Sequence, residues 1–243
     1  MRILLLGGTS EARALAAQLH PDVEVISSLA GRVPDPALPM GHVRIGGFGG
    51  ADGLRDWIRE TAVDAVVDAT HPFAAKITAT AAAVCAELAV PHLLLVRPAW
   101  SPGDAITVAS DIHAAHVVAE QGFSRVFLTT GRTGTAVFKG SDAWFLIRAV
   151  TPPDADALPA RHQILLSRGP YTYEDELELL RENGIDALVT KNSGGAMTRP
   201  KVDAAATLNI PVIMVERPSV PSGVETVHAV DDAVAWVRTT RTS

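Results

Sequence analysis

The chain has 243 residues, 47% hydrophobic and 20% charged, a composition that fits one large or two small globular domains and excludes a disordered chain. A net charge of −6 argues against a nucleic-acid-binding protein, and the single cysteine, Cys85, excludes an internal disulfide and a cysteine-rich metal site. No apolar run approaches the roughly 18 residues of a membrane span, and Met1-Arg2 precedes too few apolar residues for a secretory signal, so we expect a cytoplasmic protein with no membrane partner.

Strand-like and helix-like segments alternate from the first residues onward. Most strand-like segments are continuously apolar, which is typical of strands covered on both faces of a parallel sheet. Strand–helix–strand alternation predicts an α/β fold with right-handed crossovers. The expected strands are Ile3–Leu6, Val23–Ser27, Ala65–Asp68, His92–Val96, Val126–Thr129, Trp144–Ile147, Gln163–Leu166, Ala187–Thr190 and Val212–Val215, and the clearest helices are Glu11–Leu19, Gly53–Glu60, Ala74–Leu88, Glu174–Glu182 and Pro200–Leu208.

The sequence repeats itself at about half its length. Trp57–Val67 reappears as Leu179–Val189, with Asp64 and Asp186 lying 122 residues apart. Three further pairs match in order: Val90–Pro98 with Ile210–Pro218, Arg2–Gly7 with Arg125–Gly131, and Ile106–Glu120 with Glu225–Val237, the last as a short strand followed by a helix. We therefore predict two similar Rossmann-like domains with parallel sheets, residues 1–122 and 123–243, that arose by internal duplication and face each other across a cleft.

A glycine-rich turn, Gly7-Gly8-Thr9-Ser10-Glu11, lies between the first strand and the first helix. Its glycines allow a sharp turn, and its hydroxyls cap a helix whose free N–H groups favour a phosphate. The turn lacks the third glycine of G-x-G-x-x-G, and a helix cap without a ligand is the alternative. We predict dinucleotide binding here, with Gly8, Thr9, Ser10 and Glu11 as contacts.

The end of the second strand indicates which dinucleotide binds. No carboxylate that would hold a ribose 2′-OH follows this strand, whereas Ser28 and Arg32 are available for a 2′-phosphate. The sequence therefore favours NADP in domain 1–122, with Arg32 as a plain solvated residue being the alternative. A second glycine-rich loop, Gly46–Gly50, predicts either a close approach of Gly47 to a flat ligand or a bare flexible loop.

Seven motifs, in order and over nearly the whole chain, resemble the precorrin-6A reductase family of cobalamin biosynthesis. They are Gly7–Glu11, Ser28–Arg32, Gly46–Gly50, Asp68–Ala74, Thr130–Arg132, Ser167–Pro170 and Thr190–Gly195. The resemblance implies that NADPH reduces the C18–C19 double bond of precorrin-6A to give precorrin-6B. It also implies that the cofactor binds the first domain and that domain 123–243 contributes to the substrate cleft.

The chemistry of that reaction suggests roles for polar residues at strand ends. His71 has the pKa range of a proton donor, although capping the next helix or stacking on a ligand are alternatives, and Thr70 beside it is a candidate cofactor contact. An anionic tetrapyrrole needs cationic and polar partners. The candidates are Arg97, Arg132, Arg168, Lys191, Ser193, Gly194, Arg199 and Lys201, with a structural role equally open for Arg97.

Two other functions remain open from the sequence. One is a different NADP-dependent reductase or epimerase of the short-chain type, which is disfavoured because no Tyr-x-x-x-Lys pattern lies on a helix. The other is a dinucleotide-sensing regulatory protein. We expect no nucleic-acid partner, a monomer or a weak homodimer, and no metal, because His113 and His116 lie at helical spacing without an obvious third ligand.

Overall fold

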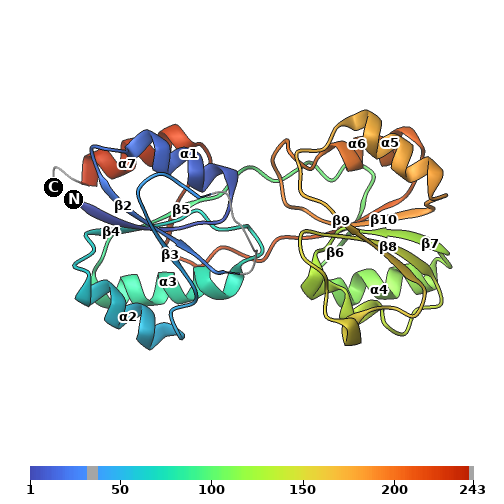
Figure 1. Ribbon diagram of the computed structural model, residues 1–243, viewed down its shortest axis with the longest axis horizontal. Coiled ribbons are helices and arrows are strands. Elements are labelled where there is room, and N and C mark those ends of the chain that lie inside the picture. Colours follow the sequence, from blue (N-terminus) through green and yellow to red (C-terminus); the bar gives the residue numbers. More distant parts are fainter. Residues whose placement is uncertain (32–37, 241–243) are drawn as a thin grey trace. The chain divides into compact units, whose positions relative to one another are not determined.

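The computed structural model describes residues 1–31 and 38–240. The chain divides into two compact units, unit 1 (Met1–Pro98 with Pro218–Ser243) and unit 2 (Ala99–Arg217) (Figure 1). Each unit is built on one six-stranded sheet whose neighbouring strands all pair in parallel. The predicted fold class, two similar Rossmann-like units with parallel sheets, is confirmed.

Sheet A of unit 1 carries helices on both faces (Figure 1). Helices α1 (Ser10–Leu19) and α7 (Val230–Thr240) cover one face, and α2 (Ala51–Glu60) and α3 (Ala75–Leu88) cover the other. In spatial order its strands are β12 (Glu225–Val227), β5 (His92–Leu95), β4 (Ala65–Asp68), β1 (Arg2–Leu6), β2 (Glu24–Leu29) and β3 (His42–Ile45). The edge strand β3 is the one that the sequence pattern did not predict, because it is short and only half-buried.

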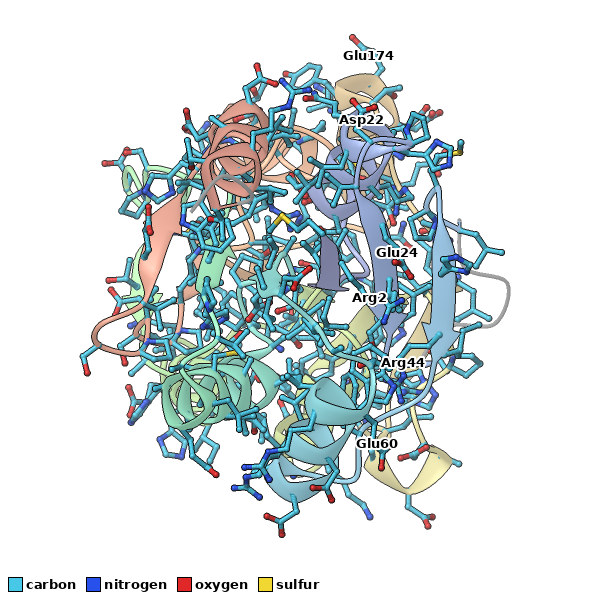
Figure 2. All side chains as sticks on the ribbon, turned by 90° about the vertical axis from the view of Figure 1, so that its left-hand side faces the viewer. Arg2, Asp22, Glu24, Arg44, Glu60 and Glu174 are labelled. Atoms are coloured by element: carbon cyan, nitrogen blue, oxygen red, sulfur yellow. The ribbon has the colours of Figure 1, made fainter. Side chains whose placement is uncertain are left out.

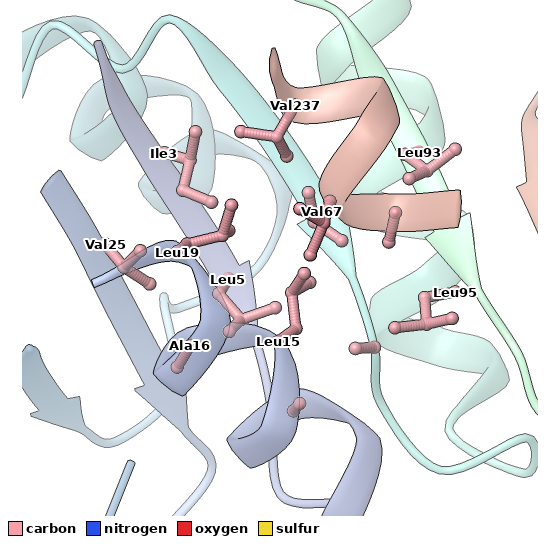
Figure 3. Packing of buried hydrophobic residues seen from close by; sticks show 14 of the residues in the cluster. Ile3, Leu5, Leu15, Ala16, Leu19, Val25, Val67, Leu93, Leu95 and Val237 are labelled. Carbon is pink, nitrogen blue, oxygen red and sulfur yellow. The ribbon is translucent and has the colours of Figure 1, made fainter. Parts of the chain in front are cut away.

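Alternation along β1 divides the core of unit 1 into two layers. Ile3 and Leu5 pack under α1 and α7 with Leu15 and Val237, all fully buried (Figure 3). Leu4 and Leu6 belong to the layer under α2 and α3. Successive side chains of a strand point to opposite faces. A strand with helices on both faces therefore has to be apolar throughout, which explains the continuous Ile-Leu-Leu-Leu run.

Sheet B of unit 2 has the same plan. Helices α5 (Tyr173–Glu182) and α6 (Pro200–Thr207) pack on one face, and α4 (Asp111–Glu120) packs on the other with the 3₁₀ turn η2 (Ala136–Phe138). Two more 3₁₀ turns are η1 (Arg132–Gly134) and η3 (Ala155–Ala157). The strands run β6 (Ile106–Val108), β11 (Val212–Val215), β10 (Ala187–Lys191), β7 (Arg125–Leu128), β8 (Trp144–Ala149) and β9 (His162–Leu166).

Equivalent contacts at the start of β1 and β7 support the duplication. The backbone N–H of Arg2 donates to the carboxylate of Asp64 at 2.6 Å, and that of Arg125 donates to Asp186 at 2.9 Å. The N–H of each aspartate donates back to the carbonyl of its arginine at 2.9 Å. In unit 1, Arg2 also pairs with Glu24 on the neighbouring strand at 2.8 Å (Figure 2).

The two repeats exchange their last strand and helix. Strand β6 and helix α4 come from the first repeat but complete unit 2, whereas β12 and α7 come from the second repeat and complete unit 1. The structure therefore divides the chain at Pro98/Ala99 and Arg217/Pro218, and not between residues 122 and 123 as expected. Because the exchanged segments have the same strand–helix pattern, either pairing satisfies the sequence pattern.

None of the helices within residues 1–31 and 38–240 combines the length and the apolar character that a membrane span requires.

Because α7 of the second repeat completes unit 1, a core substitution in α7 should destabilise unit 1 and not unit 2. Val237→Ala removes two methyl groups from a fully buried site and should lower the free energy of unfolding by about 1–3 kcal/mol. Chemical denaturation gives the size, and hydrogen exchange should show the loss in β1, β4 and β5 of unit 1. Arg238→Ala, on the exposed side of the same helix, is the control. Faster exchange confined to sheet B would contradict the observed pairing.

Candidate functional site

The turn after β1 leaves an open, helix-capped corner at the carboxyl edge of sheet A. Gly8 is exposed with φ of +113°, and a Cβ placed on it would meet no atom within 4 Å. Thr9 caps α1: its hydroxyl accepts from the N–H of Ala12 at 3.1 Å and donates to the carbonyl of Ala69 at 2.7 Å. The hydroxyl of Thr9 thus has both roles filled, so the turn can offer a ligand backbone N–H groups and the positive end of α1.

Glu11, in the first turn of α1, forms an ion pair with Arg97 at the end of β5. The two side chains are 22% and 16% exposed, and Oε2 of Glu11 lies 3.0 Å from the guanidinium and 3.0 Å from the Ser10 hydroxyl. Burial raises the pKa of Glu11, but a backbone N–H and the charge of Arg97 outweigh it and hold the pKa below its usual range. Arg97, a predicted substrate contact, therefore neutralises a carboxylate beside the phosphate-binding turn.

A second cluster at this edge centres on Arg44 of β3 (Figure 2), which the sequence analysis missed. Its guanidinium donates to the Ser28 hydroxyl at 2.8 Å and to the carbonyls of Gly46 and Gly47 at 3.0 and 3.1 Å. It lies 3.9 Å from the ring centre of Phe48. The glycine-rich loop thus wraps a half-buried arginine, and burial lowers the pKa of that arginine.

The loop after β4 is organised by a buried carboxylate. Oδ1 of Asp68 accepts from the N–H and the hydroxyl of Thr70 at 2.9 and 2.6 Å, so Thr70 turns toward Asp68. His71 is exposed, and its Nδ1 accepts from the N–H of Phe73 at 3.3 Å. With Nδ1 as the acceptor, the neutral imidazole carries its proton on Nε2.

Unit 2 places its predicted basic residues in three different environments. Lys191 Nζ donates to the carbonyl of Thr130 at 2.9 Å and lies 3.5 Å from Asp111, and Arg199 pairs with Asp203 at 2.7 Å. Arg132 and Arg168 are exposed and have no ion-pair partner within the described ranges. Lys201 is buried, so its ammonium does not face solvent as a substrate contact would.

The predicted contacts Ser193 and Gly194 lie in a loop directly after β10. Gly194 is buried with φ of +67°, and the N–H of Ser193 donates to the carbonyl of Lys191 at 2.7 Å. Asn192 of the predicted motif Thr190–Gly195 holds this loop together with Trp100, which was not singled out from the sequence. Arg32, a predicted cofactor contact, lies outside the described residues.

The single cysteine and the histidines form no metal centre in the part of the chain that the structure describes, where no group of three or more His, Cys, Asp or Glu is arranged to hold an ion. Burial, with the nearby charge of Asp68, raises the pKa of the Cys85 thiol to about 12, which makes it a poor nucleophile.

Comparison with known proteins assigns the chain to one family. The model of the family described as precorrin-6x reductase CbiJ/CobK matches residues 2–238. The chain belongs to the precorrin-6x reductase family.

Relatives and a solved structure agree with the family model. The precorrin-6A reductase of Mycobacterium tuberculosis is 68% identical over 97% of both chains, and that of Rhodococcus erythropolis is 55% identical over 98% of both. A structure titled CobK precorrin-6A reductase superimposes with a TM-score of 0.91 at 36% identity and covers 99% of this chain and 97% of its own. The chain is therefore an oxidoreductase of cobalamin biosynthesis that reduces a carbon–carbon double bond, and family membership implies a nicotinamide cofactor.

The corner at α1 fits such a cofactor in this precorrin-6x reductase. The space beside Gly8 and the capped N-terminus of α1 suit the pyrophosphate of a dinucleotide. Gly7 connects this turn to the end of β2, because its N–H donates to the carbonyl of Ser28 at 3.0 Å.

The buried position of Lys201 predicts a pH dependence of stability. Burial, the largest cause, lowers the pKa of Lys201 to about 7, whereas an unfolded lysine keeps its proton to about pH 10.4. Between these values the unfolded state binds more protons, so this lysine makes stability rise with pH by up to about 1.4 kcal/mol per pH unit. Urea unfolding of wild type and Lys201→Met from pH 7 to 9 measures the difference in slope. Parallel slopes would contradict the lowered pKa of Lys201.

Proposed function

We propose that this chain reduces the C18–C19 double bond of cobalt-free precorrin-6A, with NADPH bound at the carboxyl edge of sheet A. The relatives at 68% and 55% identity are named precorrin-6A reductases, which supports the metal-free ring as substrate. When bound, NADPH supplies the hydride, and the protein orients the ring, excludes water and delivers a proton.

The difference between the two repeats supports cofactor binding in unit 1. Strand β1 leads into the ten-residue helix α1, whose Thr9 cap orients the N-terminus toward the turn. The equivalent strand β7 leads only into the short turns η1 and η2. A 3₁₀ turn of three residues has few aligned peptide dipoles, so unit 1 offers the stronger phosphate site.

The contact between Arg44 and Ser28 is the observation that best supports NADPH over NADH as the cofactor. Three of the five guanidinium N–H groups of Arg44 donate to Ser28, Gly46 and Gly47, and stacking on Phe48 fixes the plane of the group. This cation lies where β2 ends, the position at which Rossmann folds distinguish a 2′-phosphate from a 2′-hydroxyl. A fixed arginine loses little entropy on binding a phosphate, so Arg44 joins Ser28 and Arg32 as a contact for the 2′-phosphate.

The ion pair between Glu11 and Arg97 has a supporting role in this arrangement. An isolated carboxylate in the first turn of α1 would repel the pyrophosphate, and the guanidinium of Arg97, 3.0 Å away, offsets that charge. We assign Arg97 this role in place of direct substrate binding.

His71 delivers the proton in this proposal. Its exposed ring carries the proton on Nε2, and the bond from Phe73 to Nδ1 orients it. The carbon–carbon bond gains a hydride on one carbon, and the imidazolium form of His71 gives its Nε2 proton to the neighbouring carbon, which leaves a neutral imidazole that is then reprotonated from water. Asp68 and Thr70 hold the loop from which this ring extends.

Unit 2 binds the carboxylates of the ring in this proposal. Arg132 and Arg168 follow β7 and β9 at the carboxyl edge of sheet B and are exposed. Lys191, Ser193 and Gly194 follow β10 at the same edge. Guanidinium groups at several strand ends suit a broad ligand with many carboxylates.

The assignment of Arg44 predicts a change in cofactor preference. Arg44→Ala should raise KM for NADPH by about 10- to 100-fold, because a charge-assisted contact to phosphate is lost, and should change KM for NADH little. Initial rates with precorrin-6A and each cofactor measure the ratio. Arg59→Ala, which removes an exposed charge from α2, is the control for net charge. Equal losses with both cofactors would show that Arg44 only supports the glycine-rich loop.

The assignment of His71 predicts a loss in kcat. His71→Asn should lower kcat by about 100-fold or more and remove the limb of the pH–kcat profile that reports the imidazole, with both KM values nearly unchanged. His116→Asn, at an exposed histidine of α4, should behave as wild type. A variant at His71 that keeps its rate and its pH profile would assign the proton to water or to the substrate.

A further inference from the structure

Trp100 lies beneath the loop Asn192–Gly195, here called the substrate loop, and contacts both of its ends. The backbone N–H of Trp100 donates to Oδ1 of Asn192 at 2.9 Å, and Nδ2 of Asn192 donates back to the Trp100 carbonyl at 3.1 Å. The indole N–H donates to the carbonyl of Gly195 at 2.9 Å. One residue thus fixes the first and the last residue of the substrate loop.

Each polar group of Asn192 is bonded within the protein. In addition to its two side-chain bonds, its N–H donates to the carbonyl of Val215 at 2.9 Å, and its carbonyl accepts from Nε of Arg217 at 2.8 Å. The amide side chain therefore serves the geometry of the loop, and the residue that this geometry presents is the half-buried Ser193, whereas Gly194 is buried.

Trp100 itself is held in place. It is 8% exposed and belongs to the apolar core under α5 and α6, and the ammonium of Lys201 lies 5.0 Å from the ring centre. Packing in the core restricts the rotamer of this large ring, so the indole N–H is held in the direction of the Gly195 carbonyl. The loop needs such an anchor because Gly194 and Gly195, with φ of +67° and +76°, have few intrinsic conformational restraints.

We propose that Trp100 is a positioning residue for the reductase reaction: with Asn192 it holds the substrate loop in the conformation that receives precorrin-6A. This inference rests on the proposed function, in which Ser193 contacts the ring. Trp100 touches neither substrate nor cofactor in this role and acts through the backbone of the loop.

Trp100→Phe tests the inference, because it removes the indole N–H and keeps an aromatic ring over Lys201. KM for precorrin-6A should rise by about 3- to 10-fold, the effect of one hydrogen bond, while KM for NADPH stays unchanged. Hydrogen exchange in the substrate loop should accelerate. Trp144→Phe is the matched control: Trp144 lies at the start of β8, against Arg125, and should change neither quantity.

A second variant covers the case in which Trp100→Phe does not fold. Asn192→Asp keeps an oxygen that accepts from the Trp100 N–H but replaces the amide donor by a second oxygen facing the Trp100 carbonyl. It should give the same rise in KM for precorrin-6A with NADPH binding intact. A lowered Tm with both KM values and loop exchange unchanged would overturn the inference and leave Trp100 a purely structural residue.

Ser193→Ala separates this inference from the proposed function. A raised KM for precorrin-6A in Ser193→Ala, with no change in Trp100→Phe, overturns the positioning role alone. Unchanged KM values in Ser193→Ala and in Lys191→Met would show that the loop does not contact the substrate. That result would overturn both the loop assignment and the role of Trp100. Raised KM values in all the loop variants support both.

Discussion

The carboxyl edge of sheet A depends on one hydroxyl group, that of Thr9. Where β1 ends, its backbone groups leave the sheet and must find other partners, since buried polar groups without partners are costly. Thr9 meets this need twice, by capping α1 and by bonding the Ala69 carbonyl, while Gly7 bonds the carbonyl of Ser28. Three loops that are distant in sequence are thereby fixed beside one helix N-terminus, and the proposed contacts of the cofactor follow from that junction.

Several basic side chains of the candidate site already have partners within the protein. An enzyme for a polyanionic ring needs cations, but two cations at the carboxyl edge of sheet A are already engaged: Arg97 with Glu11, and Arg44 with Ser28 and two carbonyls. Such contacts hold guanidinium groups in one geometry, which reduces the entropy lost when an anion binds. In unit 2 the exposed Arg132 and Arg168 keep more freedom. Lys191 and Arg199 of unit 2 are held by Asp111 and Asp203, so both halves fix some of their basic side chains.

Duplication with exchange also explains how the repeats could diverge. The segments that anchor the strands stayed alike, as the Arg2–Asp64 and Arg125–Asp186 contacts show. The segment after the first strand is a capped helix in unit 1 and a pair of 3₁₀ turns in unit 2. Because loops at the carboxyl edge bear little of the packing, they can vary while the sheet is retained.

The sequence by itself determined the elements other than β3, the parallel sheets, the duplication, the family and the loops that carry polar residues, because apolar periodicity and turn residues are local signals. It also offered the hydroxyls of Thr9 and Ser10 as caps of α1, and in the structure Thr9 is the cap. Only the tertiary structure decided which unit β6 and β12 complete, since both strands have the same local pattern. It likewise showed that Lys201 is buried, that Arg97 pairs with Glu11, and that Arg44 and Trp100 support the candidate site. These contacts join residues up to 95 positions apart, and side-chain partners at such separations are set by packing in three dimensions.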